Sequence, residues 1–211
     1  MIIPRLLLAG SALALTASPA FADYTLNIIH INDLHSRIES INKYDSTCNA
    51  EGEAEGKCFG GVARVATKIN ELRDAMKADG GNVLVLDAGD QFQGSLFYST
   101  YKGDTEAEFM NKIGFDAMAV GNHEFDDGPE ALANFLDKVE FPVISGNTDV
   151  SGNNLLDGRI PEHLVLEVGG QKIAIVSVLA TDTSETSAPG PTVTFTDEIE
   201  HLTKKVAELE A

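Results

Sequence analysis

The segment LNIIHINDLHSRI, residues 26–38, carries the strongest signal for fold and chemistry together. Residues 24–31 are rich in β-favouring side chains and run directly into Asn32 and Asp33, which is typical of a strand that feeds a loop. His35 follows two residues after Asp33. In extended backbone this spacing points both side chains to the same side, so one cation could bind both of them.

Strands and helices alternate after this segment. Apolar residues at three- and four-residue steps predict an amphipathic helix over 62–76 that ends near Gly80 and Gly81. The same patterns predict strands at 83–86, 117–120 and 143–145 and helices at 105–113 and 129–139. This alternation predicts an α/β architecture.

The C-terminal part adds antiparallel strands. Residues 164–168 and 172–179 flank a Gly-Gly pair, the pattern of a hairpin with a two-residue turn, and a mixed sheet is therefore expected. Residues 181–192 are rich in Thr, Ser and Pro and predict a loop. An apolar stripe predicts a helix over 197–210.

Composition and the N-terminus limit the function classes. The formal charge of -18, from 33 acidic and 15 basic residues, argues against binding nucleic acid through a broad basic face. Residues 1–22 read as a signal peptide, because Arg5 precedes an apolar run over 6–15 and small residues precede Asp23. No later stretch is long and apolar enough to span a bilayer, so a soluble exported chain beginning at Asp23 is expected.

The two cysteines lie in a polar, glycine-containing segment over 39–60 that departs from the strand and helix pattern. Cys48 and Cys58 are separated by nine residues, and an exported chain meets an oxidising compartment, which favours a disulfide between them. Two free thiols are the alternative. Zinc binding is the weaker interpretation, because structural zinc normally has four ligands and no matching cluster lies nearby.

Three predicted strands are each followed by residues that can hold a metal: Asp33 with His35, then Asp90, then Asn122 with His123. In open α/β sheets, ligands gather outside the carboxyl ends of the strands, so these loops can converge on one site. Taken singly, each group could be no more than a turn. Their combination and order resemble the arrangement of the metallophosphoesterase superfamily, which implies a metal-dependent phosphoesterase site.

The resemblance to a known family rests on longer segments. Residues 26–38 and FDAMAVGNHEFD at 115–126 resemble the two hallmark segments of the 5'-nucleotidase and UDP-sugar hydrolase family of calcineurin-like metallophosphoesterases. Supporting similarity lies in FGGVARVATKI at 59–69, LDAGDQFQGS at 86–95 and APGPTVTFTDEI at 188–199. The resemblance implies a sandwich of mixed β-sheets flanked by helices over residues 23–211, truncated at its C-terminal side.

The family pattern also implies a ligand set. Asp33 and His35 would bind the first of two divalent ions, Asp90 would bridge both, and Asn122 would bind the second. A bridging carboxylate offsets the repulsion between two cations, and neutral Asn and His add ligands without adding charge near a phosphate. Zinc, manganese, cobalt and iron all suit these donors, so the identity of the metal stays open.

His123 has a different implied role. In the family it is not a ligand but pairs with the aspartate that matches Asp126, and it would stabilise charge that develops on the phosphoryl group or the leaving oxygen. Glu124 and Asp87 are expected to support the loops rather than to bind metal. His30, on the first strand, is expected to be buried.

The function that follows is an exported two-metal phosphoesterase of the bacterial periplasm that hydrolyses 5'-nucleotides with a metal-activated hydroxide. UDP-sugars and 2',3'-cyclic nucleotides are related substrates; nucleic acid and, after signal cleavage, membrane are not expected partners. The family's later histidine ligands and its C-terminal nucleotide-binding domain have no match in the 211 residues. We therefore expect an inactive fragment, and no substrate-binding residue can be assigned.

Two alternatives remain open from the sequence. The chain could be a noncatalytic exported metal-binding or interaction module that keeps the strand-end loops. It could also be a hydrolase of sulfur-linked substrates, because relatives of the family act on them and nothing in the matched residues excludes it.

Overall fold

The computed structural model describes residues 23–211. The predicted signal peptide, residues 1–22, lies outside the described residues. None of the helices between residues 23 and 211 combines the length and the apolar character needed to cross a membrane.

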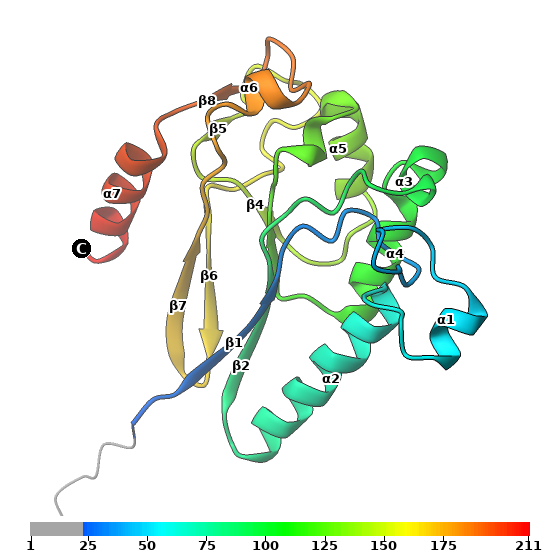
Figure 1. The fold of residues 1–211 in the computed structure, drawn as a ribbon. Helices are drawn as coiled ribbons and strands as arrows, with labels where there is room; N and C mark the ends of the chain where they lie inside the picture. The colour runs from blue at the N-terminus through cyan, green and yellow to red at the C-terminus, as the bar shows by residue number, and fades with distance from the viewer. Residues whose placement is uncertain (1–22) are drawn as a thin grey trace, which may run out of the picture.

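A four-stranded parallel sheet forms the centre of the fold (Figure 1). Its strands lie in the order β1-β2-β3-β4 and comprise β1 (Leu26–Ile31), β2 (Asn82–Asp87), β3 (Ala117–Ala119) and β4 (Val143–Ile144). All neighbouring pairs are parallel. The predicted strands are confirmed, and their carboxyl ends share one edge of the sheet.

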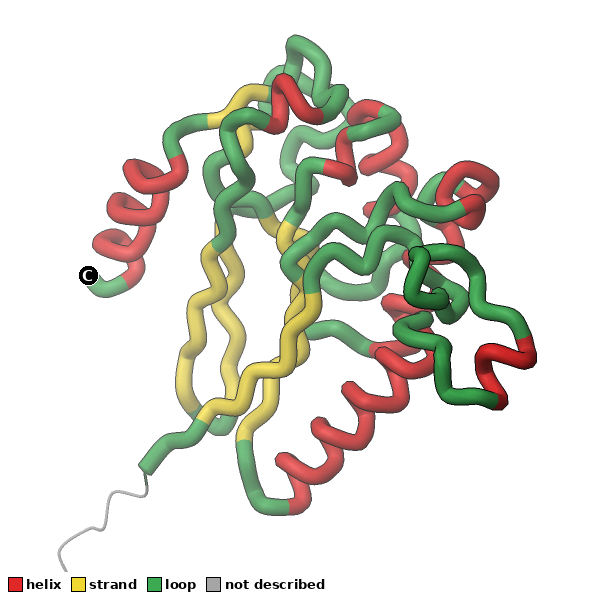
Figure 2. Tube along the Cα trace, viewed as in Figure 1, coloured by secondary structure: helices red, strands yellow, loops and turns green. Residues whose placement is uncertain are grey.

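Helices cover one face of this sheet, as Figure 2 shows in red. The predicted helices are confirmed as α2 (Val62–Ala78), α4 (Asp104–Ile113) and α5 (Gly128–Leu136). Helix α2 contacts β1 and β2 and buries Val62 and Ile69 of its apolar stripe. It ends just before Gly80, whose φ of 76° is the left-handed conformation that commonly terminates a helix.

The predicted hairpin is confirmed as β6 (His163–Val168) and β7 (Gln171–Val176), but it forms a sheet of its own instead of joining the parallel strands. It faces the side of the parallel sheet away from the helices (Figure 1). A hollow of about 410 Å³ between the two sheets is lined by residues of β1, β2, β3 and β7. His30 lines this hollow and is exposed, so the expectation that it is buried is wrong.

Short elements connect these layers. They are α1 (Ala50–Ala54), α3 (Leu96–Tyr101), the 3-10 helix η1 (His123–Phe125), β5 (Thr148–Asp149), α6 (Thr183–Thr186), β8 (Thr194–Phe195) and α7 (Glu198–Leu209). Strands β5 and β8 pair antiparallel. Helix α7 confirms the last predicted helix, whereas α6 lies inside the segment expected to be a loop. The disulfide between Cys48 and Cys58 is confirmed, with its two Cα atoms 5.7 Å apart.

Aromatic side chains fill the core next to the carboxyl edge of the sheet. Phe92 and Phe125 are fully buried, and each directly follows the residues of a predicted site loop. The ring of Phe92 packs on Tyr98 at 4.7 Å and on Phe135 at 5.2 Å between ring centroids. Buried aromatic rings contribute large contact areas, so these loops are fixed to the core at their downstream ends.

A buried carboxyl on α4 makes the stability of this core depend on pH. Glu106 is 1% exposed, and neither of its carboxylate oxygens has a hydrogen-bond partner among the described residues. Burial raises the pKa of Glu106, and the neighbouring Ser36 hydroxyl opposes only part of this shift. The folded state therefore favours the protonated acid, and its stability falls as pH rises from the unfolded-state pKa toward the higher folded-state pKa.

Glu106→Gln is expected to increase the free energy of unfolding above this pH window and to flatten its decrease with pH, because the amide carries no charge to desolvate. Urea denaturation at pH 4.5 and pH 8 measures both effects. Glu108→Gln on the same helix is the control, since Glu108 is exposed and forms an ion pair with the exposed Lys112. A Glu106→Gln protein whose stability relative to the parent is the same at both pH values would contradict this account.

Candidate metal centre

Backbone hydrogen bonds join the loops that follow β1 and β2. The parallel pairing continues past the strands, because the N–H groups of Asp33 and His35 donate to the carbonyl oxygens of Gly89 and Asp90, both at 3.0 Å. Ser36 N–H continues the series by donating to a carbonyl oxygen of the same loop at 2.8 Å. The two loops therefore form one unit, and their side chains have fixed relative positions.

The first loop is not extended, so the prediction that extended backbone points the side chains of Asp33 and His35 to the same side is wrong. Their φ angles are 53° and 48°, and Ser36 follows with 53°. The two side chains nevertheless meet, with Asp33 Oδ1 3.5 Å from His35 Nε2. Left-handed backbone costs about 1–2 kcal/mol per non-glycine residue, so the cross-loop hydrogen bonds hold a conformation that the sequence alone does not favour.

Two glycines allow the second and third loops to approach each other. A Cβ atom on Gly89 would lie 2.4 Å from the backbone nitrogen of Gly121, and one on Gly121 would lie 2.3 Å from Oδ1 of Asp90. Both distances are too short for any side chain. Glycine at these two positions is therefore a condition for bringing Asp90 next to the loop that follows β3.

The side chain of Glu124 connects the loops that follow β2 and β3. Its side chain is fully buried, and its Oε2 accepts the N–H groups of Gly121 at 2.7 Å and Asp90 at 3.0 Å. Its Oε1 accepts those of Gln91 at 2.8 Å and Phe92 at 3.3 Å. Burial raises the pKa of Glu124, and these backbone donors act against that rise by favouring the carboxylate. Glu124 thus has the supporting role predicted for it.

Three of the candidate side chains converge above this support. One ligand atom each from His35, Asp90 and His123 lies within 4.8 Å of the other two. The rings of His35 and His123 are edge-on, with centroids 4.8 Å apart. His35 Nδ1 lies 3.1 Å from the carbonyl oxygen of Phe92, which can only accept, so Nδ1 is the donor and Nε2, beside Asp33, is the nitrogen that could bind a metal. Metal-binding histidines commonly have this arrangement.

The other two predicted ligands flank this cluster. Asp33 lies at the exposed rim beside His35, with about half of its side chain exposed. Asn122 is half-buried and immediately precedes η1, next to His123. The four predicted ligands offer carboxylate oxygens, an amide oxygen and an imidazole nitrogen, a set that fits divalent zinc, manganese, cobalt or iron.

His123 and Asp126 form the predicted pair. His123 Nδ1 lies 2.6 Å from Oδ2 of Asp126, and the backbone N–H of His123 donates to Oδ1 of Asp90 at 2.9 Å. Burial acts to lower the pKa of His123, but the hydrogen bond and charge of Asp126, with the charges of Asp90 and Glu124, outweigh it and raise the pKa. A raised pKa favours the imidazolium, whose Nε2 can donate a proton.

Sequence reasoning missed two polar contacts at this site. Gln91 is fully buried and donates through Nε2 to Asp87 at 2.7 Å, while Asp87 also accepts the N–H of Gly89 at 2.8 Å. Asp87 thus supports the turn, as predicted. Ser187 donates through Oγ to Asp126 at 2.7 Å from 61 residues away. A serine in a Thr- and Ser-rich segment gives no sequence signal for such a contact.

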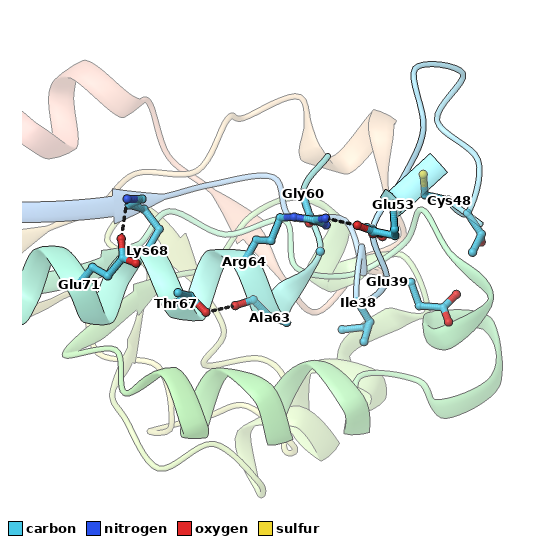
Figure 3. A pocket seen from close by; sticks show the side chains of 13 residues that line it. Ile38, Glu39, Cys48, Glu53, Gly60, Ala63, Arg64, Thr67, Lys68 and Glu71 are labelled. Carbon is cyan, nitrogen blue, oxygen red and sulfur yellow. Dashed lines mark hydrogen bonds and ion pairs between the residues drawn. The ribbon is translucent and has the colours of Figure 1, made fainter. Parts of the chain in front are cut away.

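A separate hollow of about 780 Å³ lies between α1 and α2 and contains none of the predicted metal or catalytic residues (Figure 3). Figure 3 shows that its charges pair with one another: Arg64 with Glu53, and Lys68 with Glu71. Exposed pairs of this kind carry little energy, and pairing leaves neither cation of this hollow free to attract an anionic ligand. The chemistry of the chain therefore concentrates at the carboxyl edge of the sheet.

Comparison with known proteins agrees with this geometry. The calcineurin-like phosphoesterase family matches residues 26–205. The chain is 42% identical over 195 residues to the 5'-nucleotidase of Bos taurus and 40% identical over 210 residues to a snake venom 5'-nucleotidase of Gloydius brevicauda. The crystal structure of a 5'-nucleotidase precursor from Thermus thermophilus superposes with a TM-score of 0.76 at 40% identity.

The chain belongs to the calcineurin-like phosphoesterase family. Its similarity to the 5'-nucleotidases covers 90% of this chain and 32% of the bovine protein, 98% and 34% for the venom protein, and 88% and 34% for the Thermus structure. It therefore spans about a third of the length of these relatives. The predicted fold and family resemblance are confirmed.

Replacing the Glu124 carboxylate is expected to loosen the site. Glu124→Gln puts an NH₂ group against backbone N–H donors, which leaves donors unpaired and should lower the free energy of unfolding by about 2–4 kcal/mol. Urea denaturation measures this loss. Glu130→Gln, an exposed position in α5, is the control and should change stability by less than about 0.5 kcal/mol. Equal stability of the two variants would show that Glu124 does not hold the loops together.

Proposed function

We propose that this protein is an exported metal-dependent phosphoesterase that hydrolyses nucleoside 5'-monophosphates. The observation that carries the proposal is the convergence of His35, Asp90 and His123 within 4.8 Å at the carboxyl edge of the parallel sheet. Membership of the calcineurin-like phosphoesterase family supports the reaction class, and the similarity to 5'-nucleotidases supports the substrate class.

In this proposal four residues hold two divalent cations. Asp33 and His35 would bind one ion, Asp90 would be shared by both, and Asn122 would bind the other. The position of His35 Nε2 beside Asp33 supports this assignment, as do the hydrogen bonds that join Asp90 to the first and third loops. Bound there, the ions would supply an acidified water and neutralise the phosphoryl oxygens.

The residues of the chain that act on the substrate are His123 and Asp126. Asp126 holds the proton on Nδ1 of His123, which leaves Nε2 as the ring nitrogen available to the substrate. In the imidazolium form, Nε2–H donates to an oxygen that gains negative charge as the ester bond breaks. In this assignment His123 binds the substrate and is not a metal ligand. The distance between His123 and Asp90 is compatible with either role.

Within the nucleotide class, UDP-sugars and 2',3'-cyclic nucleotides are the related substrates that we would test next. No residue among those described is assigned to the nucleoside, because the cluster contacts only the phosphate in this proposal. Substrate preference is therefore best measured on the protein produced from its full-length gene, with AMP as the first probe.

Asp90→Ala and His123→Ala distinguish the proposed roles. Both should lower the kcat for AMP hydrolysis with added Mn²⁺ by roughly 100-fold or more, because each removes a group that stabilises the transition state. Only Asp90→Ala should also lower the metal content measured by elemental analysis. His163→Ala, on β6, is the control and should retain activity.

Three other outcomes of these experiments would favour a different role or function. Loss of metal from the His123→Ala protein would make His123 a ligand and overturn its proposed role. A parent protein, without substitutions, that binds Mn²⁺ but hydrolyses no phosphoester would favour a noncatalytic metal-binding module. Cleavage of a sulfur-linked ester in preference to AMP would favour the third class.

Export is the remaining part of the proposal, and the disulfide between Cys48 and Cys58 supports it, because such bonds persist in oxidising compartments. When the full-length gene is expressed in a bacterium, the protein is expected in the periplasmic fraction with Asp23 as its first residue. Intact-mass measurement after cell fractionation tests this. Cytoplasmic protein that keeps residues 1–22 would contradict export.

A further inference from the structure

The carboxylate of Asp126 has two partners that bind its two oxygens separately. Oδ2 lies 2.6 Å from Nδ1 of His123, and Oδ1 accepts the Oγ–H of Ser187 at 2.7 Å. The Asp126 side chain is 14% exposed, so little water competes for either oxygen. An aspartate held at both oxygens cannot rotate about its terminal torsion without breaking one of the two hydrogen bonds.

The segment that carries Ser187 is itself fixed to η1. Ser187 N–H donates to the carbonyl oxygen of Thr183 at 3.0 Å, and Ala188 N–H donates to that of Phe125 at 3.3 Å. Thr183 and Phe125 are both fully buried. The hydroxyl of Ser187 therefore approaches Asp126 from a rigid support, not from a freely moving loop.

We propose that Ser187 is a positioning residue that orients Asp126 and, through it, the imidazole of His123. The inference rests on the proposed function, in which this pair assists phosphoester cleavage. The hydroxyl donates to Oδ1 and leaves Oδ2 as the oxygen that faces Nδ1–H of His123. His123 Nε2 is thereby directed toward the cluster with Asp90 and His35.

Ser187→Thr and Ser187→Val provide a matched pair, since their side chains have nearly the same shape and only Thr keeps a hydroxyl. In the protein produced from the full-length gene, Ser187→Val is expected to lower the kcat for AMP roughly 10-fold, the equivalent of one hydrogen bond to a charged group. KM and metal content should not change, and Ser187→Thr should retain most of the activity. Ser184→Ala, exposed on the same segment, is the control.

A double-mutant cycle separates positioning from general destabilisation. Ser187→Val should have no further effect on kcat in an Asp126→Ala background, because the group that it orients is absent. Additive losses would overturn the proposal, as would equal activity of the Thr and Val variants. Undiminished turnover by Asp126→Ala would instead reject the proposed role of the His123 pair, and the two failures are thus distinguishable.

A readout independent of turnover is the Nδ1 proton resonance of His123 in ¹⁵N-labelled protein. Ser187→Val should shift or broaden this resonance, whereas Ser187→Thr and Ser184→Ala should leave it in place. A resonance that is identical in all four proteins would refute the positioning role even if the parent protein hydrolysed no nucleotide. Thermal unfolding of each variant verifies that the comparison is made between folded proteins.

Discussion

The carboxylate of Glu124 is the contact on which the candidate site depends. Four backbone N–H groups, from Gly121, Asp90, Gln91 and Phe92, donate to its two oxygens in a fully buried position. Burying a charge is costly unless hydrogen bonds replace its lost hydration, and here each oxygen has two donors. Because the donors come from loops after β2 and β3, satisfying this one side chain fixes two loops relative to each other.

The conformation of the first loop follows from the same constraint. Asp33, His35 and Ser36 all have positive φ angles, which non-glycine residues avoid when nothing compensates. Hydrogen bonds to the loop after β2 hold them, and that loop is in turn bound to Glu124. These contacts connect the strained loop to the hydrophobic core, where Phe92 and Phe125 are fully buried. Such rigidity suits a site that must keep ligands at fixed distances.

The far end of the site is organised differently. His123 and Asp126 belong to η1 and the residue that follows it, and their orientation involves a segment more than 60 residues away through Ser187. Asp90 and Asp126 therefore have different supports. One support is a buried carboxylate beneath the sheet edge, and the other is a serine on a segment that packs against η1.

The strand and helix pattern, the disulfide and the order of the site loops could all be predicted from the sequence, because hydrophobic period and turn residues are local signals. Helix α3 could not be predicted, because its sequence LFYSTY consists largely of residues that favour strands. Its main helix signal is the N-cap residue Ser95, whose Oγ accepts the N–H of Phe97 at 3.1 Å. The exposure of His30 and the separation of the hairpin from the parallel sheet depended on how the layers pack.

For the site, the sequence determined which donors are present and which strand each one follows. Tertiary structure decided their geometry: the left-handed turn at Asp33 and His35, the close approach of Gly89 to Gly121, and the contact of Ser187 with Asp126. The physical reason is that donor identity is a property of single residues. Distances between loops arise instead from hydrogen bonds and buried contacts between segments that are far apart in the chain, and no local pattern encodes them.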